Sequence, residues 1–208
     1  MQKIYIKLSN GVTVLGDQFD YNDFCDFQNI FRDWLYLNGK LHSKGGRSLP
    51  VPDVFSEAMF CYAYNAVRTN GTAYSYDCVM KSDGKGVQVK SASIEKDCTS
   101  FGPRSEWDLL YFADLAPMGE VTGEINFYQL TDFNLANLIL NISKSETFEM
   151  QQNQGRRPRF SVKRKIIQEF QLLPEKTINI LDGTITDHGI RYNINDYLNN
   201  FSQWRINL

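Results

Sequence analysis

Short segments with alternating or turn-flanked hydrophobic residues occur near both ends of the chain. Residues 2–17 alternate between hydrophobic and polar positions on either side of Ser9-Asn10-Gly11, and residues 177–186 surround the pair Asp182-Gly183. Such patterns, with turn-forming residues at their centre, are typical of β-hairpins. We therefore expect one hairpin near each end.

The middle of the chain contains further strand patterns. Residues 74–80 and 86–91 flank a segment rich in turn formers that includes Asp83-Gly84, which predicts a third hairpin. Alternate side chains of a strand share a face, so Gln88 and Lys90 should point one way, and Val87 and Val89 into a core. Two apolar segments, residues 109–115 and 125–130, predict core strands after this hairpin.

Helical spacing appears in three places. Residues 20–42 and 52–68 carry apolar stripes, and residues 192–204 predict a short C-terminal helix. In the second stretch, Asp53 is the expected N-cap residue. The stripes consist of Phe24, Phe27, Ile30, Phe31, Trp34 and Leu35 in the first helix, and Phe55, Ala58, Met59, Tyr62 and Ala66 in the second.

Strands interleaved with helices predict an α/β fold with a mixed central β-sheet of four or more strands, flanked by helices, and with the hairpin of residues 74–91 in its middle. The chain has 208 residues, of which 42% are hydrophobic and 13% aromatic, so one compact domain over residues 1–208 is expected. Its expected parts are the N-terminal hairpin and helix (1–45), a core (about 50–135), a basic segment (about 150–167) and the C-terminal hairpin and helix (175–208).

Composition excludes several classes of protein. No apolar run is long enough to span a bilayer, and the N-terminus is not a signal peptide, so we expect a cytoplasmic protein without a membrane partner. Four scattered cysteines without a CxxC pair favour reduced thiols over a zinc site. Only two histidines, His42 and His188, are present, which argues against a zinc protease or a histidine-rich nuclease site.

The hairpin of residues 74–91 carries the candidate chemistry. Asp77 offers a hard oxygen ligand, and the Gln88 amide oxygen and the Val89 carbonyl can add two more, as Mg²⁺ prefers. Lys90 would face the attacking water and stabilise charge on phosphate oxygens. These residues predict a metal-dependent phosphodiesterase site, in which the cation neutralises charge on the scissile phosphate.

Two acidic residues of the helix over 52–68 need separate consideration. Glu57 lies off the apolar stripe on a helix that is hydrophobic nearly all round, and a buried acid needs a partner. It is either a further metal ligand or a first-turn glutamate favoured by the helix dipole. Pro52-Asp53 is a literal Pro-Asp pair, but it fits a helix start, and we prefer Asp77 as the metal ligand.

A basic segment follows in an otherwise slightly acidic chain. The net charge is −2, from 22 Lys and Arg against 24 Asp and Glu, yet six cations fall within residues 156–165. Such a local cluster predicts DNA binding, because phosphate contacts supply much of the affinity and arginine matches guanine in the major groove. A solvated surface loop is the alternative. The cations are Arg156, Arg157, Arg159, Lys163, Arg164 and Lys165.

The spacing of Asp77 and Gln88-Val89-Lys90 resembles the PD-(D/E)XK nuclease superfamily, with Tyr76 where the motif has Pro and Gln88 where it has Asp or Glu. In that superfamily a helix glutamate at the place of Glu57 often joins the metal site. The segments at residues 56–58, 88–90, 100–103 and 154–161 resemble a branch of type II restriction endonucleases that cut short GC-containing interrupted palindromes. The likeness covers residues 50–167 and adds Ser100, Arg104 and Gln154 to the expected DNA-binding set.

The resemblance implies a restriction-endonuclease-like fold and Mg²⁺-dependent cleavage of both strands of double-stranded DNA, leaving 5′-phosphate ends. One active site cuts one strand, so a homodimer matching the two-fold axis of the DNA is expected. A DNA methyltransferase would be its functional partner. Two alternatives remain: another nuclease of the superfamily that repairs DNA or resolves junctions, and a DNA-binding module without catalytic activity.

Overall fold

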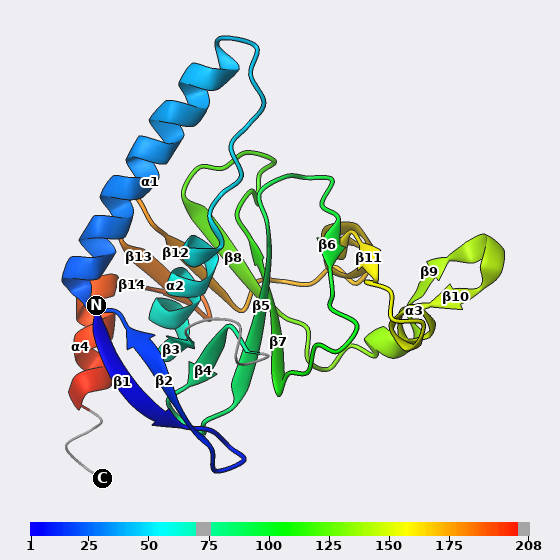
Figure 1. Ribbon diagram of the computed structural model, residues 1–208. Helices are drawn as coiled ribbons and strands as arrows, with labels where there is room; N and C mark the ends of the chain where they lie inside the picture. The colour runs from blue at the N-terminus through cyan, green and yellow to red at the C-terminus, as the bar shows by residue number, and fades with distance from the viewer. Residues whose placement is uncertain (70–75, 204–208) are drawn as a thin grey trace.

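The computed structural model describes residues 1–69 and 76–203, and its centre is a ten-stranded sheet (Figure 1). Its strands lie in the order β1 (Gln2–Lys7), β2 (Thr13–Gln18), β3 (Ala66–Thr69), β4 (Cys78–Met80), β5 (Gly86–Ala92), β7 (Leu109–Asp114), β8 (Glu124–Gln129), β12 (Lys176–Asn179), β13 (Thr184–Asp187) and β14 (Ile190–Asn193). Only β5 and β7 pair in parallel among the described strands. The expected mixed sheet is thereby confirmed.

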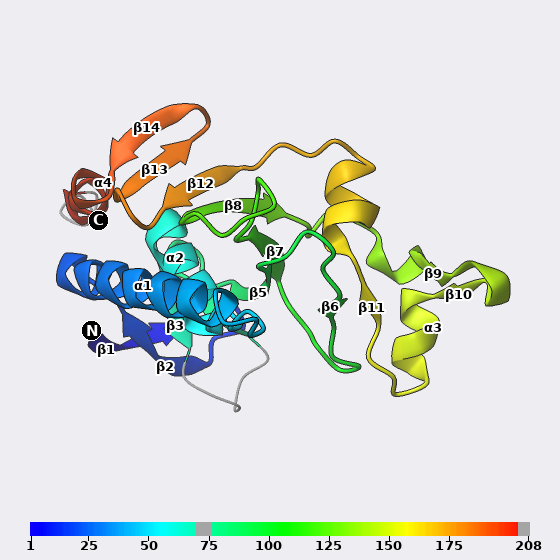
Figure 2. The same ribbon diagram turned by 90° about the horizontal axis from the view of Figure 1, so that it is seen from above.

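Helices cover one face of this sheet. They are α1 (Tyr21–His42), α2 (Asp53–Tyr64) and α4 (Ile194–Gln203). Their buried side chains, such as Phe31 and Phe60, form one core with Val87, Val89 and Ile178 of the sheet. Figure 2 shows α1 and α2 together on this side. The apolar stripes recognised in the sequence therefore pack where helix periodicity predicts.

A second core lies on the opposite face, beneath short and irregular elements. Leu110 and Phe112 of the sheet contact Phe101, Phe160 and Ile166 there. This layer, on the far side from α1 in Figures 1 and 2, was not expected from the sequence. It contains β6 (Thr99–Ser100), β9 (Ile139–Asn141), β10 (Glu146–Thr147), α3 (Phe148–Asn153), β11 (Arg159–Phe160), the 3₁₀ turns Leu135–Asn137 and Ile142–Lys144, and a π-helical segment, Lys163–Gln168.

The three expected hairpins are confirmed as β1–β2, β4–β5 and β12–β13. Residues 74 and 75 of the expected strand, and Trp204 of the expected C-terminal helix, lie outside the described residues. That helix begins at Ile194, because the residues before it form β14. No described helix combines the length and hydrophobicity needed to cross a membrane.

The helix predicted over residues 52–68 was wrong at its end. α2 stops at Tyr64, because Asn65 adopts a left-handed backbone conformation (φ 51°) that reverses the chain into β3. Ala66 therefore belongs to a strand. Asp53 was also wrong as the N-cap: Pro52 holds that position, without a side-chain cap, and Asp53 is the first helical residue.

Candidate active site

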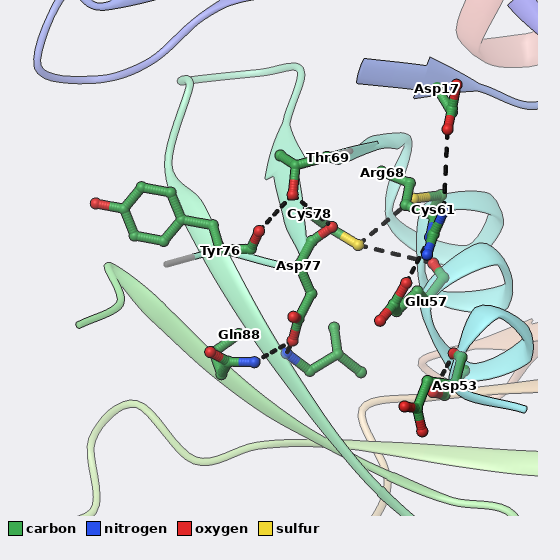
Figure 3. A network of polar contacts seen from close by, with 12 residues as sticks. Asp17, Asp53, Glu57, Cys61, Arg68, Thr69, Tyr76, Asp77, Cys78 and Gln88 are labelled. Atoms are coloured by element: carbon green, nitrogen blue, oxygen red, sulfur yellow. Dashed lines mark hydrogen bonds and ion pairs between the residues drawn. The ribbon is translucent and has the colours of Figure 1, made fainter. Parts of the chain in front are cut away.

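Asp77 lies directly before β4 and is fixed by both neighbouring strands. Its N–H donates to the Val87 carbonyl (2.9 Å), and its own carbonyl accepts from the Thr69 N–H (2.9 Å). Its carboxylate Oδ2 accepts a hydrogen bond from the Val89 N–H (2.8 Å) and another from the Gln88 side-chain amide (Figure 3). The hairpin thus brings Asp77 and Gln88 into direct contact.

The alternation along β5 is as the sequence predicts. Val87 and Val89 belong to the core beneath the helices, whereas Gln88 and Lys90 pair with Leu110 and Phe112 of the opposite face. Gln88 is buried, so its amide does not lie on an open surface.

Lys90 is half-buried beside an aromatic ring. Its ammonium lies 5.8 Å from the centroid of the Phe101 ring. Burial lowers the pKa of Lys90, the Asp77 carboxylate opposes this shift, and the nearby Arg157 guanidinium adds to it. Lys90 is therefore a less costly proton donor than a solvated lysine, and Arg157 of the basic segment is near enough to influence its charge.

Glu57 reaches the site from the first turns of α2. Its carboxylate accepts a hydrogen bond from Nε of Arg68 at 2.5 Å, so the expected partner of this acid is an arginine on β3. Burial raises the pKa of Glu57, and Arg68 opposes that rise. Arg68 also lies 3.9 Å from Asp17. The sequence pattern missed Arg68 as a partner because it assigned this residue to the helix that contains Glu57.

One cavity of about 380 Å³ joins these groups. It opens between the start of α2, the β4–β5 hairpin and β6. Ser100 lines it with its side-chain oxygen buried and without a hydrogen-bond partner in the described structure. The other lining residues relevant to chemistry are Asp53, Glu57, Asp77, Gln88, Val89 and Lys90.

The oxygen atoms that line this cavity are of the chemical type that binds a hard divalent cation. Carboxylate and amide oxygens are the ligands that Mg²⁺ and Ca²⁺ take, and burial raises the pKa of Asp77, as expected for negative charge that nearby groups do not fully compensate. The ligands are not preassembled. Within residues 1–69 and 76–203, no three His, Cys, Asp or Glu side chains converge as a ready-made metal site. Val89 contacts Asp77 through its N–H, and its carbonyl as a ligand stays a prediction.

The basic segment is attached to the rim of this cavity. β11 pairs with β6, placing Arg159 opposite Ser100, and the Phe101 N–H donates to the Pro158 carbonyl at 3.0 Å. The guanidinium-bearing residues of the segment are exposed, as are Arg104 and Gln154. They are Arg156, Arg157, Arg159 and Arg164. Arg156 donates to Glu146 (2.5 Å) and to Gln154 (3.1 Å).

The two lysines of the segment are engaged within the fold. Lys163 is buried, and its ammonium contacts Asp114 and the Ala116 carbonyl, each at 2.9 Å. Its third contact is Glu95, at 3.2 Å. Lys165 donates to the Ile139 carbonyl at 3.0 Å. The charge run therefore contains both surface cations and structural ones, a distinction that spacing alone did not reveal.

Comparison with known proteins identifies the chain's relatives. The family model for the Bsp6I restriction endonuclease matches residues 19–169. A similar protein, the type II restriction enzyme Bsp6I of Bacillus sp. (strain RFL6), is 29% identical over 165 residues, which cover 78% of this chain and 91% of that enzyme. No solved structure matches. The matched residues include α2, the β4–β5 hairpin and the basic segment. The expected relationship to restriction endonucleases is thereby confirmed, and the chain belongs to the Bsp6I restriction endonuclease family.

Proposed function

We propose that this protein is a Mg²⁺-dependent type II restriction endonuclease of the PD-(D/E)XK superfamily, with its catalytic site in the cavity between α2 and the β4–β5 hairpin. One observation carries the proposal. In a chain that belongs to a restriction endonuclease family, one cavity contains Asp77, Gln88 and Lys90. An acidic group, an amide and a lysine beside one another are the groups needed to hold a cation and a phosphate.

Asp77, Gln88, the Val89 carbonyl and Glu57 are the proposed metal ligands. When bound, Mg²⁺ would neutralise charge that develops on the scissile phosphate. In the described structure Gln88 presents its amide nitrogen to Asp77. To offer oxygen to a cation, this amide has to turn, which exchanges one contact with Asp77 for a ligand bond.

Lys90 is proposed to act on the nucleophile and the phosphate. Its ammonium can donate hydrogen bonds to a water and to phosphate oxygens in the same cavity. The lowered pKa that results from burial makes a proton on Nζ easier to share than in a solvated lysine. Substrate phosphate would in turn favour the charged form, so binding of DNA and protonation of Lys90 support each other.

DNA is proposed to lie across the exposed side of the basic segment. Four arginines there, at positions 156, 157, 159 and 164, are exposed, and the β6–β11 pairing sets Arg159 opposite Ser100, a residue that lines the cavity. Ser100, Arg104 and Gln154 extend this set, and Lys165 lies at its edge. Lys163 is left out because its ammonium is buried against Asp114. Arg157, whose charge acts on Lys90, is the basic residue best placed to contact the phosphate that is cut.

Cleavage of both strands follows from symmetry. A cavity of this kind contains one set of catalytic groups, so a homodimer would present two sets to a two-fold symmetric DNA site. A short GC-containing interrupted palindrome is the proposed target, with 5′-phosphate ends as product. A DNA methyltransferase of the same specificity would protect the host DNA.

The test is digestion of a plasmid of known sequence with purified protein in Mg²⁺. Discrete fragments whose mapped ends share one short palindrome support the proposal. Asp77→Asn and Lys90→Ala should each abolish cleavage while DNA binding in Ca²⁺ persists. Cleavage retained by either variant would overturn the site assignment. Cutting restricted to four-way junctions would indicate a resolvase, and absence of both cutting and cation binding would indicate a binding module.

A further inference from the structure

Asp53 lies one helical turn before Glu57 at the start of α2. Residues four apart on a helix share a face, and both side chains line the cavity that contains Asp77. Figure 3 shows Asp53 and Glu57 on the flank of α2 that faces Asp77. The pair Pro52-Asp53, whose residue types fit a helix start, therefore lies at the candidate active site.

The carboxylate of Asp53 differs from those of Glu57 and Asp77, because both of these accept hydrogen bonds from other residues. Glu57 accepts a hydrogen bond from Arg68, and Asp77 accepts two hydrogen bonds from β5. Within the described ranges, no side chain or backbone N–H forms a hydrogen bond or ion pair with the carboxylate of Asp53. Its side chain is exposed, so a solvated cation can reach its oxygens without displacing a protein group.

The balance of charge in the cavity depends on this residue. Three carboxylates line it, those of Asp53, Glu57 and Asp77, together with one cationic side chain, Lys90. Arg68 pairs with Glu57. Removal of Asp53 would therefore take away one of the two lining carboxylates that have no arginine partner, and with it much of the cavity's electrostatic attraction for a divalent ion. Asp53 acts on each of the nearest groups: its charge raises the pKa of Asp77 and Glu57.

We propose that Asp53 is a ligand of the catalytic divalent cation and supplies the negative charge that the neutral Gln88 does not. This inference rests on the proposed function, because it concerns the same metal site. Ligation can be direct or through a metal-bound water, since Asp53 stands at the open side of the cavity. Glu57 accepts a hydrogen bond from Arg68. It would then contribute less to holding the cation than the family resemblance implies.

The alternative role of Asp53 is a favourable contact with the N-terminal dipole of α2, where first-turn acids are common. Asp196 provides a matched control, because it is an exposed acid in the first turn of α4. Asp53→Asn and Asp196→Asn therefore remove the same charge from the first turn of a helix. Only the first lies at the cavity.

Binding of Ca²⁺ to the protein–DNA complex, measured by isothermal titration calorimetry, tests the proposal without requiring turnover. Asp53→Asn should weaken Ca²⁺ binding by about tenfold or more, since even indirect partners of metal ligands have effects of this size. The Mg²⁺ concentration for half-maximal cleavage should rise in parallel. Asp196→Asn should leave both values unchanged, and Asp53→Glu, which keeps the charge, should retain measurable Ca²⁺ binding.

The outcomes separate this proposal from the function on which it rests. If Asp53→Asn binds Ca²⁺ as the unmodified protein does, while Asp77→Asn does not, Asp53 is not a ligand and the nuclease site stands. If the unmodified protein binds no Ca²⁺ in the presence of DNA, the metal site as a whole fails. Equal melting temperatures of the two Asn variants would confirm that a difference in Ca²⁺ affinity does not arise from unfolding of α2.

Discussion

The side-chain amide of Gln88 donates a hydrogen bond to the carboxylate of Asp77. A carboxylate in the place of Gln88 could not make this contact without a proton or a cation between the two groups. The neutral amide therefore lets the two side chains contact each other without a cation between them. In the proposed metal site, the same neutrality would make Gln88 a weaker ligand than a carboxylate.

Gln88→Glu should make the site more dependent on its metal. Two carboxylates in contact repel each other, so the free energy of unfolding should fall without a divalent cation and recover when Mg²⁺ or Ca²⁺ is added. Chemical denaturation with and without Ca²⁺ measures this. Gln88→Met, of similar length but without charge or oxygen donors, is the control: it introduces no repulsion and should gain no more stability from Ca²⁺ than the unmodified protein does. A Gln88→Glu protein with unchanged Ca²⁺ affinity would contradict Gln88 as a neighbour of the metal.

Lys163→Met should destabilise the fold. The substitution leaves the buried Asp114 without its charged partner, which typically costs about 3–5 kcal/mol of unfolding free energy. Urea denaturation measures the loss. The double variant Lys163→Met/Asp114→Asn should recover much of it, because the unpaired charge is gone. A single variant as stable as the original protein would show that the ion pair contributes little.

Replacement of the exposed arginines should weaken DNA binding and leave stability nearly unchanged. Arg157→Ala, Arg159→Ala and Arg164→Ala should each change stability by less than about 0.5 kcal/mol, because these side chains are exposed. Each should weaken DNA binding and reduce the slope of log affinity against log salt by about 0.9 if it contacts one phosphate. Fluorescence anisotropy at several salt concentrations measures this. Arg191→Ala, in the C-terminal hairpin, is the control and should leave the slope unchanged.

Arg68→Met should make stability depend on pH through Glu57. Burial raises the pKa of Glu57, and removal of Arg68 deletes the contacts that lower it, so the folded-state pKa should rise further above the unfolded value. The folded state then binds a proton at a higher pH than the unfolded state does. At neutral pH the Arg68→Met protein should therefore have a lower free energy of unfolding than the unmodified protein. It should regain part of this loss as the pH falls through the folded-state pKa of Glu57 toward its unfolded-state pKa, about 4.3 for glutamate.

Denaturation of the Arg68→Met protein at about pH 5 and pH 7.5 measures this difference, relative to the unmodified protein at each pH. Arg68→Met/Glu57→Gln lacks the titrating group and should show no such recovery. Recovery in the double variant would assign the effect to another acid, of which Asp17 is the nearest to Arg68.

Elements with strong local signals could be predicted from the order of residues alone. Period-two alternation and turn-forming pairs located the β1–β2, β4–β5 and β12–β13 hairpins, because these turns need particular residues such as Gly84 at positive φ. Alternation also fixed that Gln88 and Lys90 share a face. The spacing from Asp77 to Lys90, together with the family resemblance, was sufficient to expect a restriction endonuclease.

Which charged side chains form ion pairs, and which stay exposed, depends on the folded chain. Arg68 lies in β3 and not in the expected helix, because Asn65 reverses the chain. From this strand its side chain contacts Glu57. Lys163 points inward to Asp114, although Arg164 directly after it remains at the surface. Contacts between segments far apart in the chain leave no pattern in the local sequence, since they form only when helices and loops pack against the faces of the sheet. For the same reason only the folded chain shows Asp53 at the cavity.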